Sequence, residues 1–175
     1  MTETTHDALA RPRPENAQDA AAWDHAATVS DPEIPVLTIE DLGILREVRV
    51  AGTAVEVAIT PTYSGCPAMD VIREDVTAVL TEAGYTSVSV RQVLAPAWTT
   101  DWISQNGRDK LREYGIAPPT GARQAGPVPL SLSVQCPQCR SLRTREVSRF
   151  GSTACKALFA CLDCLEPFDY FKELR

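Results

Sequence analysis

Histidine is scarce in this chain of 175 residues, and the scarcity argues against several kinds of catalytic site. A carboxylate-bridged di-iron centre takes Glu-x-x-His pairs from two helices of a bundle, and His6 and His25, both near one end of the chain, do not supply them. Two histidines also leave little basis for Cys–His or Ser–His catalysis. No glycine-rich dinucleotide or phosphate loop is present, so we expect no flavin, NAD or ATP. These absences favour a protein that is not itself the catalyst.

Long apolar runs and strong positive charge are also missing. No run approaches the ~20 apolar residues that span a bilayer, and the start of the chain lacks the basic and apolar regions of a secretory signal. The net charge is −6, and residues 131–175, with seven basic and five acidic residues, are only mildly basic. We therefore expect a cytosolic (cytoplasmic) protein with neither a membrane nor nucleic acid as its partner. In the cytosol its six cysteines are thiols or metal ligands rather than disulfides.

Four of the cysteines form two C-x-x-C pairs near the C-terminus, Cys136 with Cys139 and Cys161 with Cys164. A C-x-x-C turn directs two sulfurs toward one point, and two such turns facing each other complete a tetrahedral four-sulfur site. Four thiolates suit zinc or iron rather than magnesium or calcium. We expect structural zinc, and the sequence leaves open a redox-active or exchangeable site for iron or an iron–sulfur cluster.

The chain is expected to consist of four segments: a polar tail at 1–14, an α/β (α+β) domain at 15–117, a linker rich in proline and glycine at 118–130, and a small zinc ribbon with four cysteines at 131–175. In the domain, apolar alternation predicts strands at 44–50, 54–60 and 86–93, the first two joined as an antiparallel hairpin. Helices are expected at 15–29, from residue 67 to Gly84, and at 106–114. The predicted fold class is thus a compact three-stranded sheet with helices, followed by the ribbon.

Cys66 stands apart from the four-cysteine set. It follows a predicted strand and opens a predicted helix, where the helix dipole and free N–H groups favour a thiolate. Pro67 suits the first helical turn because its missing N–H is not needed there. Two interpretations remain open: a small residue buried at a tight junction, or a nucleophile or exposed metal ligand.

A second motif, Asp31-Pro-Glu33-Ile-Pro35, lies upstream, and its two prolines fix the backbone around Glu33. In one interpretation Asp31 caps a helix and Glu33 is simply solvated. In the other, these carboxylates approach Cys66 and form an oxygen and sulfur pair that could hold a labile metal. Cys155, between the two C-x-x-C pairs, is either a buried apolar residue or an auxiliary thiol beside the metal.

These motifs together resemble a known family. The segments Asp31-Pro-Glu-Ile-Pro and Thr60-Pro-Thr-Tyr-Ser-Gly-Cys-Pro-Ala-Met are similar to the small metal–sulfur cluster assembly domain of iron–sulfur maturation factors, over roughly residues 15–117. The segments Trp98-Thr-Thr-Asp-Trp, Phe150-Gly-Ser-Thr-Ala-Cys-Lys and Cys164-Leu-Glu-Pro-Phe resemble the D subunits of the phenylacetyl-CoA epoxidase system, almost end to end. The resemblance implies an accessory or maturation role in aerobic phenylacetate breakdown, beside a di-iron oxygenase.

Two functions follow from the resemblance and the cysteines. The first is delivery of iron or an iron–sulfur cluster to the other subunits of the epoxidase system, either the oxygenase or its iron–sulfur reductase. The alternative is a purely structural or chaperone-like zinc-ribbon subunit with no metal transfer. The net charge disfavours a ribbon that binds nucleic acid. A dithiol oxidoreductase is disfavoured because a single bound metal accounts for both C-x-x-C pairs. Self-association is left open.

Overall fold

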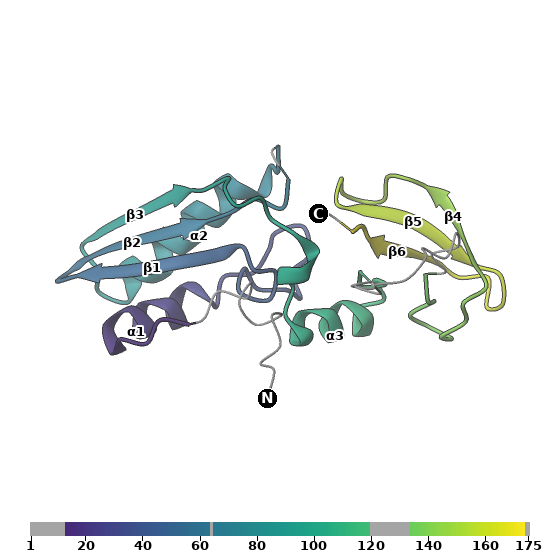
Figure 1. Ribbon diagram of the computed structural model, residues 1–175, viewed down its shortest axis with the longest axis horizontal. Helices are drawn as coiled ribbons and strands as arrows, with labels where there is room; N and C mark the ends of the chain where they lie inside the picture. Colours follow the sequence, from purple (N-terminus) through teal and green to yellow (C-terminus); the bar gives the residue numbers. More distant parts are fainter. Residues whose placement is uncertain (1–12, 64, 120–133, 174–175) are drawn as a thin grey trace, which may run out of the picture. The chain divides into compact units, whose positions relative to one another are not determined.

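The computed structural model describes residues 13–63, 65–119 and 134–173 (Figure 1). The chain forms two compact units, one ending at Gly107 and the other beginning at Arg108. Of the predicted tail and linker, only residues 13–14 and 118–119 belong to the described part. The four segment boundaries therefore stay predictions. Among the described helices, none is both long and apolar enough to cross a bilayer.

The first unit contains the predicted three-stranded sheet, in the order β1-β2-β3. Strand β1 (Leu45–Ala51) pairs antiparallel with β2 (Ala54–Ile59), so the predicted hairpin is confirmed. Gly52 makes the turn with a φ of 64°, in the region that glycine adopts without steric conflict. Strand β3 (Ser87–Gln92) pairs parallel with β2, and the crossover between them is helix α2 (Ala68–Glu82).

Helices α1 (Ala17–Ala26) and α2 pack on the sheet, α1 against β1 and α2 against β3, and they also contact each other. The apolar side chains of α2 recur at helical spacing, which gives the helix one buried face. The core between helices and sheet includes Val48, Val55, Val57, Ile59, Met69, Ile72, Val76 and Leu80. Helix α1 is shorter than the predicted 15–29 because Asn16 caps its start and Ala27 closes its end.

The opposite face of the sheet is polar. Arg91 on β3 forms ion pairs of 2.8 Å with both Glu47 on β1 and Glu56 on β2, and Arg49 lies 2.6 Å from Glu47. Exposed pairs of this kind contribute only about 0.2–1 kcal/mol each. Their effect is to leave this face hydrated, so the core of the unit lies on the helical side alone.

Between α1 and β1 the chain makes a long turn that is held from outside by the segment after β3. The indole N–H of Trp98 donates to the Leu42 carbonyl at 2.8 Å. Gly43 has a φ of 70°, and a Cβ there would lie 2.7 Å from the Cβ of Trp102, so only glycine fits. Trp102 ends the short helix η1 (Thr100–Trp102), and α3 (Gln105–Glu113) follows.

The second unit is built on an antiparallel sheet in the order β4-β5-β6. Its strands are β4 (Thr144–Ser148), β5 (Lys156–Cys161) and β6 (Pro167–Phe171). Ala117 extends the sheet beyond β6: its N–H donates to the Asp169 carbonyl, and its carbonyl accepts from Phe171. The core is small and consists mainly of Ala117, Val134, Ala157, Phe159 and Phe168 together with the thiols of Cys136 and Cys161. A core of this size rarely holds a fold by itself, so a metal bound by these thiols would stabilise it.

Candidate functional site

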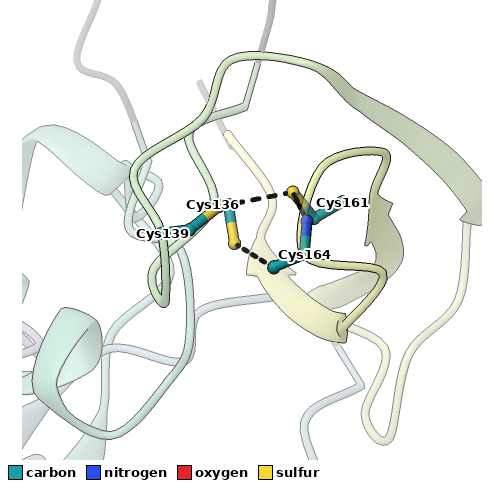
Figure 2. A group of neighbouring side chains, drawn as sticks. All are labelled: Cys136, Cys139, Cys161 and Cys164. Carbon is teal, nitrogen blue, oxygen red and sulfur yellow. Dashed lines mark hydrogen bonds between the residues drawn. The ribbon is translucent and has the colours of Figure 1, made fainter.

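The four cysteines of the two C-x-x-C pairs converge on one point in the second unit (Figure 2). The Sγ atoms of Cys136 and Cys164 are 3.7 Å apart, those of Cys139 and Cys161 are 3.5 Å apart, and all four lie within 4.8 Å of one another. A disulfide would bring two sulfurs to about 2.05 Å. Tetrahedral ligation at about 2.3 Å instead separates the sulfurs by roughly 3.8 Å. The spacing therefore fits a four-sulfur metal site.

Both cysteine pairs sit in turns of the same geometry. The N–H groups of Asp163 and Cys164 point to the Cys161 sulfur at 3.4 and 3.5 Å, which stabilises a thiolate there. The residue after each pair, Arg140 or Leu165, has a φ of 63° or 65° and turns the chain away from the sulfurs. The repeated local geometry explains why the C-x-x-C spacing alone was enough to predict this site.

The thiols of Cys161 and Cys164 do not ionise alike. The backbone N–H of Cys164 lowers the pKa of the Cys161 thiol to about 6; burial opposes this shift, and the N–H of Asp163 adds to it. The N–H of Glu166 lowers the pKa of Cys164, but burial and the neighbouring thiols outweigh it and raise that pKa to about 12. A bound divalent metal displaces the protons of those thiols that are still protonated, so binding is expected to release protons.

These donors fit a closed structural site. Four protein thiolates fill a tetrahedral shell and leave no position for substrate. Zinc and iron both accept four thiolates, whereas magnesium and calcium do not. The group of four does not include Cys155, which is buried just before β5 with its sulfur 3.0 Å from the Thr153 hydroxyl. Its neighbour Lys156 is buried as well, and its amine lies 3.3 Å from the Asp169 carboxylate.

Cys66 lies in the loop between β2 and α2, directly before Pro67, and is half-buried. Burial raises the pKa of its thiol, the N–H of Ala68 lowers it, and the negative charges of Glu33 and Asp31 raise it further. The prediction that the helix start favours a thiolate is therefore wrong, because the pKa of the Cys66 thiol is raised overall. Desolvation and two carboxylates outweigh the helix N-terminus, and the raised pKa leaves the sulfur protonated at neutral pH.

The charges of Glu33 and Asp31 act on the pKa of Cys66, although more than thirty residues separate them from it in sequence. Asp31 is buried, and Glu33 is half-buried. Among the described residues, the group of ligand atoms that lie close enough together to hold a metal is that of the four ribbon cysteines, and Cys66, Asp31 and Glu33 do not belong to it.

Two threonines near Cys66 were not singled out from the sequence. Thr62 forms a side-chain hydrogen bond with the Cys66 thiol, which lowers the thiol pKa. Thr60 is 1% exposed, and its hydroxyl has no hydrogen-bond partner in the described part of the chain. A buried hydroxyl without a partner is unfavourable unless it has another use. The sequence feature that could have pointed to these two threonines is Thr60-Pro-Thr62, which leads from β2 into the loop of Cys66.

Together, the three-stranded domain with a cysteine at a helix start and the four-sulfur ribbon define a class of two-part metal-handling proteins. Residues 20–91 match the family described as "Iron-sulfur cluster assembly protein", and residues 123–172 match the "PaaD zinc beta ribbon domain". The chain is also 49% identical over 150 residues to the D subunit of a "Putative 1,2-phenylacetyl-CoA epoxidase" from Escherichia coli (strain K12), a match that covers 86% of this chain and 90% of that protein. The chain therefore belongs to the family of phenylacetyl-CoA epoxidase D subunits.

Two further relatives each match about half of the chain. An "Fe-S protein maturation auxiliary factor" of Porphyromonas gingivalis is 40% identical over 86 residues, which is 48% of this chain and 81% of that protein. The crystal structure of a domain of unknown function, DUF59, from Bacillus anthracis superposes with a TM-score of 0.51 at 26% identity, covering 54% of this chain and 92% of that one. The predicted α/β fold class is confirmed by this likeness.

Proposed function

We propose that this chain is an accessory subunit that assists maturation of the phenylacetyl-CoA epoxidase system by delivering iron or an iron–sulfur cluster. The observation that carries the proposal is the grouping of Cys66 with Glu33 and Asp31 beside the start of α2. Membership of the family of epoxidase D subunits indicates which enzyme system is served. The relative described as an iron–sulfur maturation auxiliary factor supports iron or an iron–sulfur cluster as the cargo. The recipients are other subunits of that system, the oxygenase or its iron–sulfur reductase, and the setting is the cytosol.

The ribbon cysteines and Cys66 have different roles in this proposal. The four thiolates of the ribbon make a closed site that suits a resident zinc ion and stabilises the small sheet around it. In this proposal Cys66 supplies one ligand of a second, incomplete site, whose ion is cargo. An incomplete shell lets a thiol of a donor or recipient enter before the cargo leaves, which is the requirement for transfer.

The raised pKa of Cys66 suits a transfer role. A thiol that is protonated at neutral pH must lose its proton when it binds a metal, and the proton competes with the metal. The metal therefore binds Cys66 more weakly at neutral pH than it would bind a cysteine of ordinary pKa. It is also released more easily when a recipient arrives. The carboxylates that raise the pKa also attract a cation, which favours iron over a neutral electrophile.

A purely structural or chaperone-like subunit is the second candidate. The observation that favours it is the closed four-sulfur site, which has no open position for chemistry. In this alternative Cys66 is a packing residue, and the ribbon alone accounts for the need for metal.

The two candidates are separated by Cys66→Ser in cells that make the whole epoxidase system. We expect the oxygenase or the reductase purified from these cells to contain less iron than from cells with the parent chain. Cys155→Ala is the matched control, because it removes a thiol outside both metal-binding groups. Full metal content in both recipients with Cys66→Ser would refute the transfer role and leave the structural one.

A further inference from the structure

The two edges of the first sheet differ. At the β1 edge the N–H of Val50 donates to Oδ1 of Asp19 on α1 at 2.7 Å, and α1 packs against this strand. At the opposite edge, the sheet ends with β3 in the described part of the chain. Of the two edges, that of β3 is therefore the one where a further strand can pair.

Three residues of β3 direct their backbone polar groups away from the sheet. The N–H of Ser87 donates to the carbonyl of Thr53, just before β2, at 3.4 Å. The N–H of Val93, directly after β3, donates to the carbonyl of Ile59 on β2 at 2.8 Å. Because the N–H and C=O groups of successive residues in a strand point to alternate sides, the residues between them with even numbers point outward. These outward residues are Val88, Val90 and Gln92.

Strand β3, all of which is described, also lacks the features that usually protect an edge. Protected edges are commonly interrupted by proline or by a bulge, or they present a charge. The segment Ser87–Gln92 contains no proline, and its register with β2 is unbroken. Its single charged side chain, Arg91, reaches inward to Glu56 on β2 and Glu47 on β1, both at 2.8 Å. The edge is therefore regular and leaves its backbone groups accessible.

The unit that contains this edge is strongly acidic. Residues 1–107 include six basic and sixteen acidic residues. Helix α2 packs against β3 and has four exposed acidic residues, Asp70, Glu74, Asp75 and Glu82. The charge attracts a cationic segment and repels a second copy of the same unit.

We propose that the free edge of β3 binds an extended, basic segment of a partner protein, which adds a fourth strand to this sheet. Main-chain hydrogen bonds to the three outward residues supply the affinity. The acidic charge of the unit favours lysine or arginine in the added strand. Neither Cys66 nor the four ribbon cysteines belong to this edge, so its binding can be measured apart from metal transfer.

The test uses the full chain and a six-residue peptide, the length of β3, in which lysine and threonine alternate. Amide hydrogen exchange with saturating peptide should show new protection at Val88, Val90 and Gln92, because each N–H gains an acceptor. The N–H groups of Ser89 and Arg91 face β2 and should change little. A peptide with glutamate in place of lysine should bind at least about tenfold more weakly at low salt.

Gln92→Pro tests the role of the backbone directly. Proline removes one outward N–H, and it is tolerated on an edge strand where that N–H faces solvent. Gln92→Ala is the matched control, because it keeps the N–H and removes only the side chain. We expect the lysine peptide to bind Gln92→Pro about fivefold or more weakly than the parent, and Gln92→Ala within about twofold.

Three results would overturn the proposal. The first is a parent chain that does not bind the lysine peptide, and the second is equal binding of the glutamate peptide. The third is protection of the three outward amides in the chain without peptide that grows with protein concentration, since a second copy would then be the occupant. The exchange pattern of the parent decides between these results even if Gln92→Pro does not fold.

Discussion

At the scale of single residues, Leu165 occupies a backbone conformation that suits glycine better. Its φ of 65° lies in the left-handed region, where a Cβ is crowded and only glycine is unhindered. Its side chain is also 77% exposed and contributes little to the ribbon core. The position follows Cys164 directly, so the strain is a consequence of the turn that brings two sulfurs to the metal.

Leu165→Gly should therefore not destabilise the ribbon. Relief of the left-handed strain is worth about 1 kcal/mol, and the greater freedom of glycine in the unfolded chain offsets part of it. We expect a free energy of unfolding equal to that of the parent or up to about 1 kcal/mol higher. Denaturant unfolding of the zinc-loaded protein measures it. A loss of more than about 1 kcal/mol would mean that the Leu165 side chain packs in a way that its exposure does not show.

At the scale of elements, we expect the ribbon strands to depend on metal more than the first sheet does. Strands β4, β5 and β6 enclose a core of few apolar side chains, two of which are the ligands Cys136 and Cys161. The first unit, in contrast, buries aliphatic residues from three strands and two helices. Apparent binding free energies for structural zinc reach about 10–16 kcal/mol in small peptides, which exceeds what such a small core can supply.

Removal of the metal should unfold these three strands and leave β1, β2 and β3 folded. A strong chelator, or Cys136→Ser, removes the metal or one of its ligands, and amide exchange followed strand by strand measures the result. We expect protection to be lost on β4–β6 and kept on β1–β3. Protection of β4–β6 that persists without metal would show that the aromatic packing of Phe159 with Phe168 and Tyr170 is sufficient.

The sequence predicted those elements whose signals are local. Alternating valines located β2, the glycine turn located the hairpin, and helical spacing located α2. The four-sulfur group was predictable because each C-x-x-C turn places its own two sulfurs. The parallel pairing of β2 and β3 was not predicted, because it depends on the path of the crossover helix.

The ionisation of Cys66 could not be predicted from its position at a helix start either. The helix dipole is visible in the sequence, but the burial and the two carboxylates that outweigh it come from a distant loop. The grouping with Asp31 and Glu33 was raised only as one of two interpretations, since contacts across more than thirty residues require the fold. The hydrogen bonds that Oδ1 of Asp31 accepts from the backbone N–H groups of Glu33 and Ile34 are likewise visible only in the structure.

At the scale of the whole molecule, the chain combines two kinds of metal chemistry. One unit contains a closed set of four thiols, and the other a thiol, Cys66, whose pKa is raised by burial and by the charges of two carboxylates. Both parts match families of their own, and the family of D subunits joins them in one chain. The proposed function places a permanent metal in the ribbon and a transient one at Cys66.

The most direct test is the metal content of the chain purified without oxygen, for the parent and for Cys66→Ser. We expect both proteins to contain zinc in the ribbon, and the parent also to contain iron or sulfide that Cys66→Ser lacks. Zinc alone, in equal amount in both proteins, would contradict metal transfer through Cys66 and make this chain a structural zinc-ribbon subunit.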